Sequence, residues 1–450
     1  MRGCIAAIVV LAALAAQSRA LVVSSRYITS DVTWSPADDT IKITREIFIR
    51  NGATLVIEAG TNVTGFKADL SGIWRWCVYT QSDAAIQVNG TKDNNVNFYA
   101  VCLEWDGITR DEDNWVKNAT FRSGWGHGLC EFRNDNTGSS EVSHVLFENI
   151  TMPDCGSCGF YITSGGSPTI RRGVFNGGTC GIWGHGGGEM VIEYSMFTNH
   201  SATAIIPGGM GSQNNPASYE PMSCRINHCT FNNIDDKGSV SGVPAATGFA
   251  ICTINYPGTL IVTNSIFQNI ARSAIRDNNI EDYHYDENWV VSTDYNCYYM
   301  VGEDPVRLLP TGSHSIVDQD PLMNDPDNGD VSLKAGSPCL NVASDGTNIG
   351  AWQGPTSVRE PDIYGSFTAG LGALANPFRG SVVFNFDSYN GAWLNLYNTR
   401  GEQVNRLLVQ NNRVHWDGRD SQGIDLVPGL YYYNLNADNF SSLRTIIKID

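Results

Sequence analysis

A short pattern of aromatic, aliphatic and polar positions recurs along the middle of the chain, between residues 115 and 300. Its most regular member is an aromatic residue followed by polar ones, as in the strings VLFEN, SMFTN and SIFQN. The aromatic positions recur at intervals of 22 to 36 residues, at Phe121, Phe147, Phe175, Phe197, Phe231, Phe267 and Tyr295. A period in the twenties, with longer insertions in some copies, predicts a solenoid.

Two further columns keep a fixed register with these aromatic residues. Five positions earlier stands a β-branched aliphatic residue in every copy: Val116, Val142, Ile170, Ile192, Ile226, Val262 and Val290. Such residues suit buried strand positions, so we expect them to lie one above another inside a coil. Two positions after the aromatic come Asn149, Asn199, Asn233 and Asn269, for which we predict a hydrogen-bonded ladder of stacked side chains.

A second short strand follows each aromatic position. Its inward residues are predicted to be Leu129, Phe160, Ile182, Ile205, Phe249 and Ile275. Because side chains alternate along a strand, the outward set is then Cys130, Tyr161, Trp183, Ile206, Ala250 and Arg276. Two residues further on, the same face carries Phe132, Thr163, His185, Gly208, Cys252 and Asn278.

These columns resemble the right-handed parallel β-helix family, the fold of pectate lyases and of many secreted polysaccharide-active or adhesive proteins. The resemblance extends over residues 41 to 353, from IFIRNGATLVIEAG near its start to the closing turns around SPCLNVASDGTNIGAW. It implies an all-β fold, with a right-handed parallel β-helix solenoid over residues 26–355.

The composition changes near Pro355. Residues 356–374 lack periodicity and are predicted to be a linker, whereas residues 375–450 contain short alternating strands separated by Gly, Asn and Asp turns, as in a small Ig-like β-sandwich. The module resembles the C-terminal sorting domain of type IX secretion substrates and the related FlgD-like Ig fold, through Asn376, Pro377, Gly401, Trp416, Asp417, Gly418, Asp420, Gly423, Gly429 and Tyr431. The resemblance implies recognition by the secretion machinery; the alternative is an Ig-like module that only packs on the coil.

Composition and charge narrow the choice of partners. With 46 Gly and 17% charged residues the chain is a poor candidate for a helical bundle, and a net charge of −17 disfavours nucleic acid, which needs a basic surface. Residues 1–20 read as a secretory signal peptide, with Arg2 before an apolar run and Ala20 at a small-residue cleavage site. No later stretch is long and apolar enough for an integral membrane segment, so we expect a secreted or outer cell-surface protein.

Cysteine spacing gives a geometric prediction. Removal of Cys4 with the signal peptide leaves eleven of the twelve cysteines, so at least one thiol stays unpaired. Cys155 and Cys158 have the spacing of a metal knuckle, but without a second close pair we favour burial or a disulfide over zinc. Cys158 and Cys180 fall in one column on adjacent turns, about 5 Å apart, which predicts either a disulfide or two stacked thiols.

Candidate chemistry lies on the outward face of the second strand. Tyr161, Trp183 and His185 form a predicted platform on which sugar rings can stack, or else they cover the coil beneath loops. The segment from residue 276 to 288 supplies Arg276, Asp277, Glu281 and Asp282, which can ligate Ca²⁺ through their carboxylates or form a solvated acidic loop. Arg276 and His185 are the weak candidates for a catalytic role, and no carboxylate pair with a recognisable family spacing stands out.

Three functions remain open on these grounds. The leading hypothesis is an exported protein whose β-helix binds extracellular polysaccharide. The second is a lyase or glycoside hydrolase acting on that polysaccharide. The third is a structural adhesin in which the coil is a spacer without a glycan site.

Overall fold

The computed structural model describes two parts of the chain. The first is residues 21–352 except 39, 70–71, 82, 107–112, 123–127, 134–142, 164–165, 187, 209, 213–214, 221, 239–245, 255–257, 278–288 and 308. The second consists of residues 372–373, 378–385, 393–398, 403–410, 413–436 and 444–449. The predicted signal peptide and nearly all of the predicted linker lie outside the described residues.

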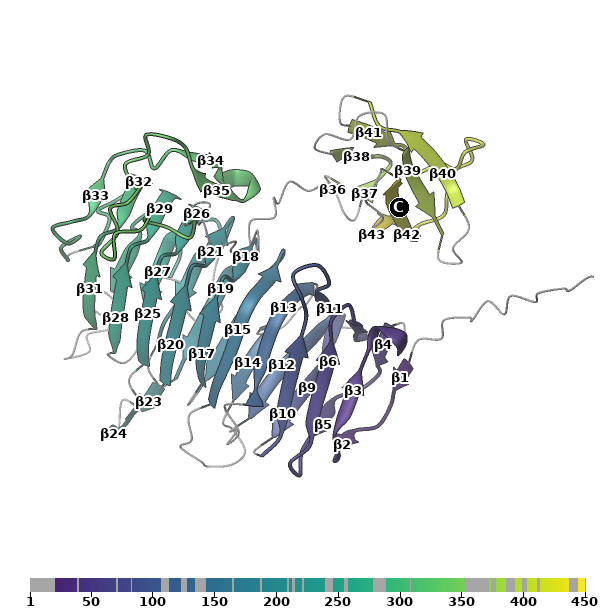
Figure 1. The fold of residues 1–450 in the computed structure, drawn as a ribbon, viewed down its shortest axis with the longest axis horizontal. Helices are drawn as coiled ribbons and strands as arrows, with labels where there is room; N and C mark the ends of the chain where they lie inside the picture. The colour runs from purple at the N-terminus through teal and green to yellow at the C-terminus, as the bar shows by residue number, and fades with distance from the viewer. Residues whose placement is uncertain are drawn as a thin grey trace, which may run out of the picture. The chain divides into compact units, whose positions relative to one another are not determined.

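The first part is dominated by a 20-stranded sheet whose strands pair in parallel (Figure 1). Most turns of the coil contribute two strands to it, one after the other. The strands are β1 (Leu21–Val23), β3 (Val32–Trp34), β4 (Thr40–Ile43), β6 (Thr54–Glu58), β7 (Asn62–Thr64), β10 (Ala85–Asn89), β11 (Val96–Tyr99), β13 (Trp115–Arg122), β15 (Ser143–Met152), β17 (Gly166–Arg171), β18 (Val174–Asn176), β20 (Gly188–Glu193), β21 (Met196–Thr198), β25 (Met222–Asn227), β26 (Thr230–Ile234), β28 (Thr259–Thr263), β29 (Ile266–Ile270), β31 (Val290–Asp294), β32 (Cys297–Val301) and β33 (Ile316–Val317).

A second sheet closes the coil, with one strand from each turn. It runs in chain order through β2 (Tyr27–Ile28), β5 (Ile47–Ile49), β9 (Gly72–Gln81), β12 (Val101–Asp106), β14 (Cys130–Arg133), β16 (Phe160–Thr163), β19 (Cys180–His185), β22 (Thr203–Ile206), β27 (Phe249–Thr253) and β30 (Ile275–Asp277). Strand β8 (Phe66–Asp69) pairs with β9 in an antiparallel hairpin. The stacked parallel turns confirm the predicted right-handed parallel β-helix.

Several short elements accompany the two sheets of the coil. Strands β23 (Met210–Ser212) and β24 (Asn215–Glu220) form an antiparallel hairpin, and β34 (Met323–Asp325) pairs with β35 (Asp330–Leu333). Two single-turn 3₁₀ helices, η1 (Pro36–Asp38) and η3 (Pro326–Asn328), complete the regular structure of this part.

The predicted inner columns are confirmed over most of the coil. Ile170 pairs with Ile192, Ile192 with Ile226, and Ile226 with Val262, all fully buried. The aromatic column beside them stacks ring on ring, from Phe175 to Phe197 at 4.6 Å, then to Phe231 at 5.1 Å and to Phe267 at 4.8 Å between centroids. The coil is therefore filled by columns of like residues, each contacting its neighbours in the turns above and below.

Two copies of the predicted register are wrong. Phe147 pairs with Val116 and Ile170, so it occupies the aliphatic column, and Met152 fills the aromatic place next to Phe175. Near the end of the coil Tyr298, not Tyr295, pairs with Phe267, and Thr293, not Val290, pairs with Val262. Val290 is 66% exposed. The predicted column member Val142 lies outside the described residues.

The second predicted column is also shifted at two turns. Phe160 pairs with Cys130, not Leu129, and Ile205 pairs with Ile251 two residues beyond the Thr203–Phe249 pair. The inward column is therefore Cys130, Phe160, Ile182, Ile205, Ile251 and Ile275. Because one residue of shift exchanges the two faces of a strand, Cys130 and Phe132 point inward, and the predicted outward positions of both residues are wrong.

The asparagines form hydrogen-bonded ladders, as predicted, but they form two separate ladders and not one. Asn269 donates to Asn233, Asn233 to Asn199 and Asn199 to Asn176, with N···O distances of 2.6 to 3.2 Å. Asn149 belongs to a separate ladder, in which it donates to Asn118 at 3.1 Å. Asn199, Asn233 and Asn269 have φ near +55°, a left-handed conformation that Asn adopts more readily than most residues.

The chain divides into two compact units, the coil and a C-terminal unit formed mainly by residues 362–450. The C-terminal unit has a three-stranded sheet of β36 (Gly372–Ala373), β38 (Val382–Asn385) and β41 (Arg413–Trp416). Its five-stranded sheet contains β37 (Phe378–Arg379), β43 (Arg444–Ile449), β42 (Gly429–Asn436), β39 (Trp393–Tyr397) and β40 (Gln403–Leu408). Residues from both sheets, among them Phe384, Leu394 and Trp416, share one core, as expected for a β-sandwich.

Candidate functional site

One outward column of the second sheet carries aromatic and charged residues, several of which are buried. We call this column the outer ribbon. Its members occupy successive strands, and their neighbours Val78, Leu103, Phe132 and Ile182 lie in the core on the opposite face. The outer ribbon consists of Tyr27, Phe48, Tyr79, Glu104, Glu131, Tyr161, Trp183, Ile206, Cys252 and Arg276.

Aromatic side chains occupy the outer ribbon in two groups. Phe48 stacks on Tyr79 with ring centroids 4.6 Å apart and an interplanar angle of 9°, and Tyr27 lies 6.0 Å beyond Phe48. Tyr161 and Trp183 meet edge to face at 5.3 Å. Tyr79, Tyr161 and Trp183 are all half-buried, so each keeps part of its ring accessible.

Two carboxylates separate these aromatic groups. Glu104 on β12 pairs in register with Glu131 on β14, so their Cα atoms lie about 4.8 Å apart. Both point away from the core, yet they are only 5% and 1% exposed. The Glu131 carboxylate accepts a hydrogen bond from the Gly128 backbone N–H at 3.0 Å. Asp106, two residues after Glu104 on the same face, is also buried.

Cys77 and Cys102 lie beside this pair. They are register partners on β9 and β12, and their sulfur atoms and a Glu104 oxygen all lie within 4.8 Å of one another. Tyr79 is hydrogen-bonded to the Cys77 side chain, and its pKa is raised well above the usual value by burial and then by the nearby Cys77, Glu104 and Glu46. The phenol therefore stays protonated and can donate a hydrogen bond at neutral pH.

The structure places the predicted platform on this ribbon. Tyr161 and Trp183 are register partners, and Thr163 pairs with His185 two residues further on. The side chain of His185 lies outside the described residues. Of the three predicted platform residues, Tyr161 and Trp183 are thus brought together as a contacting pair.

Arg276 and Asp277 lie at the other end of the second sheet, on β30. The Arg276 guanidinium lies 4.9 Å from the centre of the Phe249 ring and is nearly buried. One Asp277 oxygen accepts from the Thr253 hydroxyl at 2.8 Å, and the other accepts from the Trp289 backbone N–H at 3.2 Å. The other predicted calcium ligands, Glu281 and Asp282, lie outside the described residues. Through these two hydrogen bonds, Asp277 links β27 to the backbone at Trp289.

The structure shows where the cysteines of the two predicted pairs lie. Cys158 and Cys180 are free thiols that share one column, two residues before the register partners Phe160 and Ile182, which matches the predicted stacked thiols. Cys155 is fully buried, and burial raises the pKa of its thiol.

The sequence prediction did not include Glu104 or Glu131, and for Glu131 the reason is an error of one residue in the predicted register. The predicted register placed Leu129 inward, which made Glu131 an inward residue and hid it from the outward set. The structure places Cys130 inward instead, and Glu131 then stands directly between Glu104 and Tyr161. The alternation CEF over residues 130–132 is a usable signal, because a Glu flanked by two apolar residues suits the outward position of a strand.

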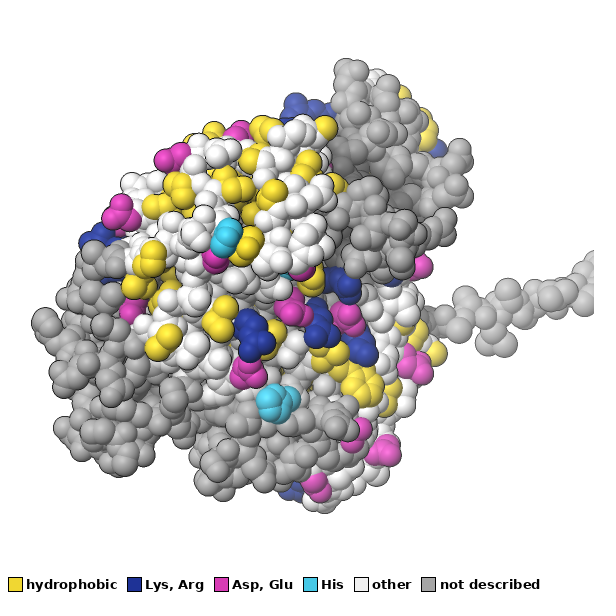
Figure 2. All heavy atoms as spheres, turned by 60° about the vertical axis from the view of Figure 1, so that its left-hand side comes forward, with side chains coloured by type: hydrophobic (Ala, Val, Ile, Leu, Met, Phe, Trp, Pro, Cys, Tyr) yellow, Lys and Arg dark blue, Asp and Glu magenta, His cyan; other side chains and the backbone are white. Residues whose placement is uncertain are grey.

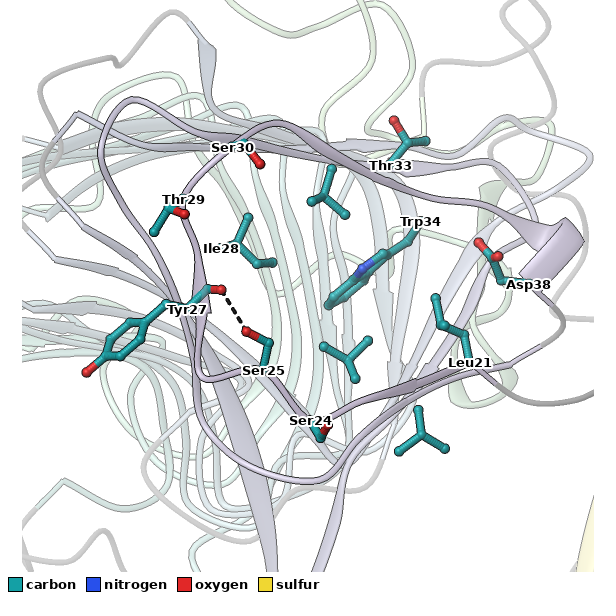
Figure 3. Close-up of a pocket in the computed structure, with 13 residues that line it drawn as sticks. Leu21, Ser24, Ser25, Tyr27, Ile28, Thr29, Ser30, Thr33, Trp34 and Asp38 are labelled. Atoms are coloured by element: carbon teal, nitrogen blue, oxygen red, sulfur yellow. Dashed lines mark hydrogen bonds between the residues drawn. The ribbon is translucent and has the colours of Figure 1, made fainter.

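The rest of the described surface provides weaker candidates for a binding site. Figure 2 shows charged side chains of both signs scattered over the described surface of one face, without a large patch of one sign. A hollow of about 500 Å³ lies at the first turn, lined by residues 21–34 and Asp38. Figure 3 shows Trp34 pointing into this hollow and Tyr27 pointing out of it. Its carboxylate, Asp38, accepts from the Ser35 backbone N–H at 3.1 Å, so it serves the local turn.

Comparisons with known proteins support the fold. The family model described as "right handed beta helix region" matches residues 106–292, which include β13 to β30 and so most of the outer ribbon. No curated protein matches the chain.

One solved structure aligns with a small part of the chain. It belongs to PorZ, described as an essential surface component of the type-IX secretion system of Porphyromonas gingivalis. The alignment has 21% identity and covers 19% of this chain and 13% of that one, with a TM-score of 0.17, too low to indicate a shared fold.

A membrane-spanning helix is not found among the described residues.

Proposed function

We propose that the outer ribbon binds an extended polysaccharide chain. One observation carries the proposal: the paired carboxylates Glu104 and Glu131 are flanked along a single outward column by aromatic residues on both sides, Tyr79 before them and Tyr161 after them. Sugar rings bind through stacking on aromatic faces and through hydrogen bonds from their hydroxyls to carboxylates. Along one line, the ribbon places half-buried aromatic rings on either side of two carboxylates that are themselves buried.

The spacing of the ribbon suits a linear ligand. Adjacent strands lie about 4.8 Å apart, which is close to the length of one sugar unit along an extended chain. A glycan lying across the strands therefore meets a new side chain at each step. The carboxylates favour a neutral, hydroxyl-rich chain over a polyuronate, because uronate groups would be repelled by Glu104 and Glu131.

Affinity electrophoresis on a panel of neutral and uronate-containing glycans tests this proposal. We expect retardation by a neutral glycan and about a tenfold weaker interaction for Trp183→Ala, which removes one stacking surface. Tyr299→Ala is the matched control, because Tyr299 is a half-buried aromatic residue on β32 of the other sheet. Equal weakening by both variants, or no retardation on any glycan, would argue for the spacer function instead.

A second function, hydrolysis of the same glycan, is favoured by the carboxylate pair itself. Glycoside hydrolases use two carboxyl groups at one bond, one as a general acid and the other as a nucleophile or general base. Glu104 and Glu131 are register partners on adjacent strands and point to the same outward face. Tyr79, with its protonated phenol, is placed to hold a sugar hydroxyl next to them.

Product release separates hydrolysis from binding. Glu131→Gln and Glu104→Gln keep the shape of the ribbon, so we expect each to keep glycan retention while lowering reducing-end release by at least about a hundredfold. Retention without any product from the unchanged protein would leave the chain a binding protein. Product release that survives both substitutions would place the chemistry elsewhere.

We also propose that the C-terminal unit directs export. Support comes from its β-sandwich core and from the compact turn of the WDGRDSQG string, in which Asp420 accepts hydrogen bonds from the Gln422 and Ile424 backbone N–H groups. A fusion of residues 357–450 to a periplasmic reporter should reach the cell surface of a host with type IX secretion. A reporter that stays inside such a host would count against this role.

A further inference from the structure

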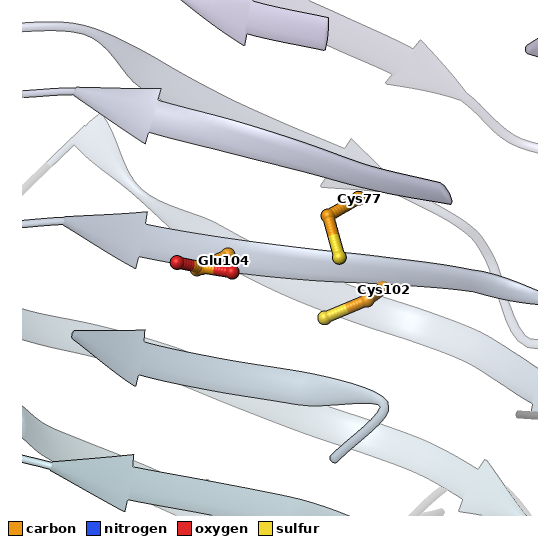
Figure 4. Close-up of side chains that lie close together, drawn as sticks. All are labelled: Cys77, Cys102 and Glu104. Atoms are coloured by element: carbon orange, nitrogen blue, oxygen red, sulfur yellow. The ribbon is translucent and has the colours of Figure 1, made fainter. Parts of the chain in front are cut away.

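Two pairs of thiols lie close together across adjacent turns of the coil. Cys77 on β9 is the register partner of Cys102 on β12 (Figure 4), and their sulfurs lie within 4.8 Å. Cys158 and Cys180 lie two residues before the register partners Phe160 and Ile182, so they share one column, and the pKa of the Cys180 thiol is raised by burial and then by Cys158. The two residues of each pair are separated by 25 and 22 positions in the sequence, respectively.

We propose that these two pairs close into disulfides, Cys77–Cys102 and Cys158–Cys180, each joining two adjacent turns of the coil. Adjacent parallel strands hold register partners about 4.8 Å apart at Cα, within the range that a disulfide requires. Register partners also project to the same face of a sheet, so their Cβ atoms face the same side. Figure 4 shows the Cys77 and Cys102 sulfurs next to each other between neighbouring strands.

The other cysteines on the strands do not share this arrangement in register. Cys130 pairs with Leu103 and Phe160, Cys224 with Met190 and Leu260, Cys252 with Arg276, and Cys297 with Ile266 and Ile316. The proposal therefore selects two of the many possible pairings among the mature cysteines. This selectivity makes it open to a direct test.

The bond-forming step needs an oxidant, which we take to be a small-molecule or protein disulfide. One thiolate attacks the oxidant and releases one of its sulfurs as a thiol, leaving a mixed disulfide on the protein. The partner thiolate then attacks that protein sulfur and releases the second thiol. Two electrons pass to the oxidant, and the two protons lost from the protein thiols end on the two released thiols. An oxidising compartment supplies such an oxidant, so bridging in the cell rests on the proposed export.

Accessibility sets when each bridge forms. Cys77 is half-buried, so the Cys77–Cys102 pair can react in the folded protein. Cys158 and Cys180 are buried, and burial raises the pKa of the Cys180 thiol, which leaves little reactive thiolate once the coil is formed. We expect that second bridge to form while the turns dock, during folding.

Peptide mass mapping of the full chain refolded in glutathione redox buffer tests the proposal. Free thiols are alkylated under denaturing conditions without reductant, and a parallel sample is refolded with excess dithiothreitol. We expect the two named bridges in the first sample and none in the second. Complete alkylation in both samples, or bridges joining other partners such as Cys155 and Cys158, would overturn the proposal. Because purified protein and a defined oxidant are used, this result does not depend on export or on glycan binding.

A thermal measurement and a metal assay complete the test. The oxidised chain should unfold at least about 5 °C above the reduced chain. Cys102→Ser and Cys180→Ser should each remove part of this difference, whereas Cys224→Ser should keep all of it. Zinc that copurifies in equimolar amount and is lost in Cys102→Ser would overturn the Cys77–Cys102 bridge, because Cys77, Cys102 and Glu104 would then be metal ligands.

Discussion

At the scale of single residues, His200 links stability to pH. It is 1% exposed and lies near Phe197 in the core, and burial lowers its pKa from 6.5 to about 4. The unfolded chain therefore binds more protons than the folded chain between these values. Stability is fully present above about pH 6.5 and falls as the pH drops toward 4, by about 2 kcal/mol at pH 5 from this group alone.

Comparison with His200→Phe isolates this contribution. The variant lacks the titrating ring, so its free energy of unfolding should lose about 2 kcal/mol less than that of the unchanged protein between pH 7 and pH 5. Urea unfolding at both pH values provides the measurement. The quantity to compare is the difference between the two proteins in this loss of unfolding free energy, because the carboxylates contribute the same pH dependence to both. An identical loss in both proteins would show that His200 accepts its proton without cost.

Asn233 illustrates how the ladder is specified. It donates to Asn199, accepts from Asn269, and has φ of +57°. Asn233→Ala loses both hydrogen bonds and must hold a left-handed conformation, which together should cost about 2–3 kcal/mol in unfolding free energy. Asn233→Gly loses the same bonds but adopts this conformation freely, so it should cost about 1 kcal/mol less. Chemical denaturation of the two variants separates the two effects, and equal losses would mean that the backbone conformation is not strained.

At the scale of elements, the sequence predicts the columns well and the register of irregular turns poorly. Ile170, Ile192 and Ile226 are regularly spaced from their aromatic partners, and the structure stacks them as predicted. The strand β15 is longer, and its Phe147 is an aromatic residue in an aliphatic place. Either residue type is apolar enough for the core, so the pattern alone cannot decide between the two registers.

In the candidate site too, prediction of the register from sequence fails at one strand, and there the error hides a residue of the site. Tyr161 and Trp183 were predicted to lie on one outward face because their strands are regular. Glu131 is missed because the predicted register of its strand is wrong by one residue, and a shift of one residue moves it from one face to the other. Glu104 lies outside the region where the repeat is recognisable in the sequence. Only the pairing of β12 with β14 reveals that the two carboxylates are neighbours.

The aromatic column makes a prediction about stability at this scale. Phe231 is fully buried and stacks on Phe197 and Phe267, with interplanar angles of 10° and 0°. Phe231→Ala removes both contacts and leaves a cavity, which should cost about 3–5 kcal/mol in unfolding free energy. Phe231→Leu keeps most of the volume and should cost less.

A surface substitution on the neighbouring strand is the control. Arg225 on β25 forms an exposed ion pair with Glu189 at 3.4 Å, so Arg225→Ala should change the unfolding free energy by less than about 0.5 kcal/mol. A loss as large as that of Phe231→Ala would mean that the outer face, and not the inner columns, holds adjacent turns together. Denaturant unfolding of all three variants under one set of conditions makes the comparison.

At the scale of the whole molecule, each of the two units has its own main hydrophobic core. The first fills the coil from Ile28 to Val306, and the second lies within the C-terminal β-sandwich. A solenoid is held by contacts between successive turns, whereas a small sandwich depends on a few central side chains. The proposed glycan site lies wholly on the coil, and the proposed export signal wholly on the sandwich, so each role can be tested with the other unit intact.

Trp416 tests whether the two units also unfold separately. Its ring is fully buried in the sandwich, lies 5.6 Å from Tyr431 edge to face, and donates a hydrogen bond from Nε1 to the Arg419 carbonyl at 2.8 Å. Because each unit has its own core, we expect two transitions in calorimetry. Trp416→Ala should cost the sandwich about 3–5 kcal/mol and lower or abolish the smaller transition, while the coil's midpoint stays unchanged. Removal of residues 362–450 should delete that same transition. A single transition that Trp416→Ala shifts as a whole would show instead that the coil and the sandwich unfold as one cooperative unit.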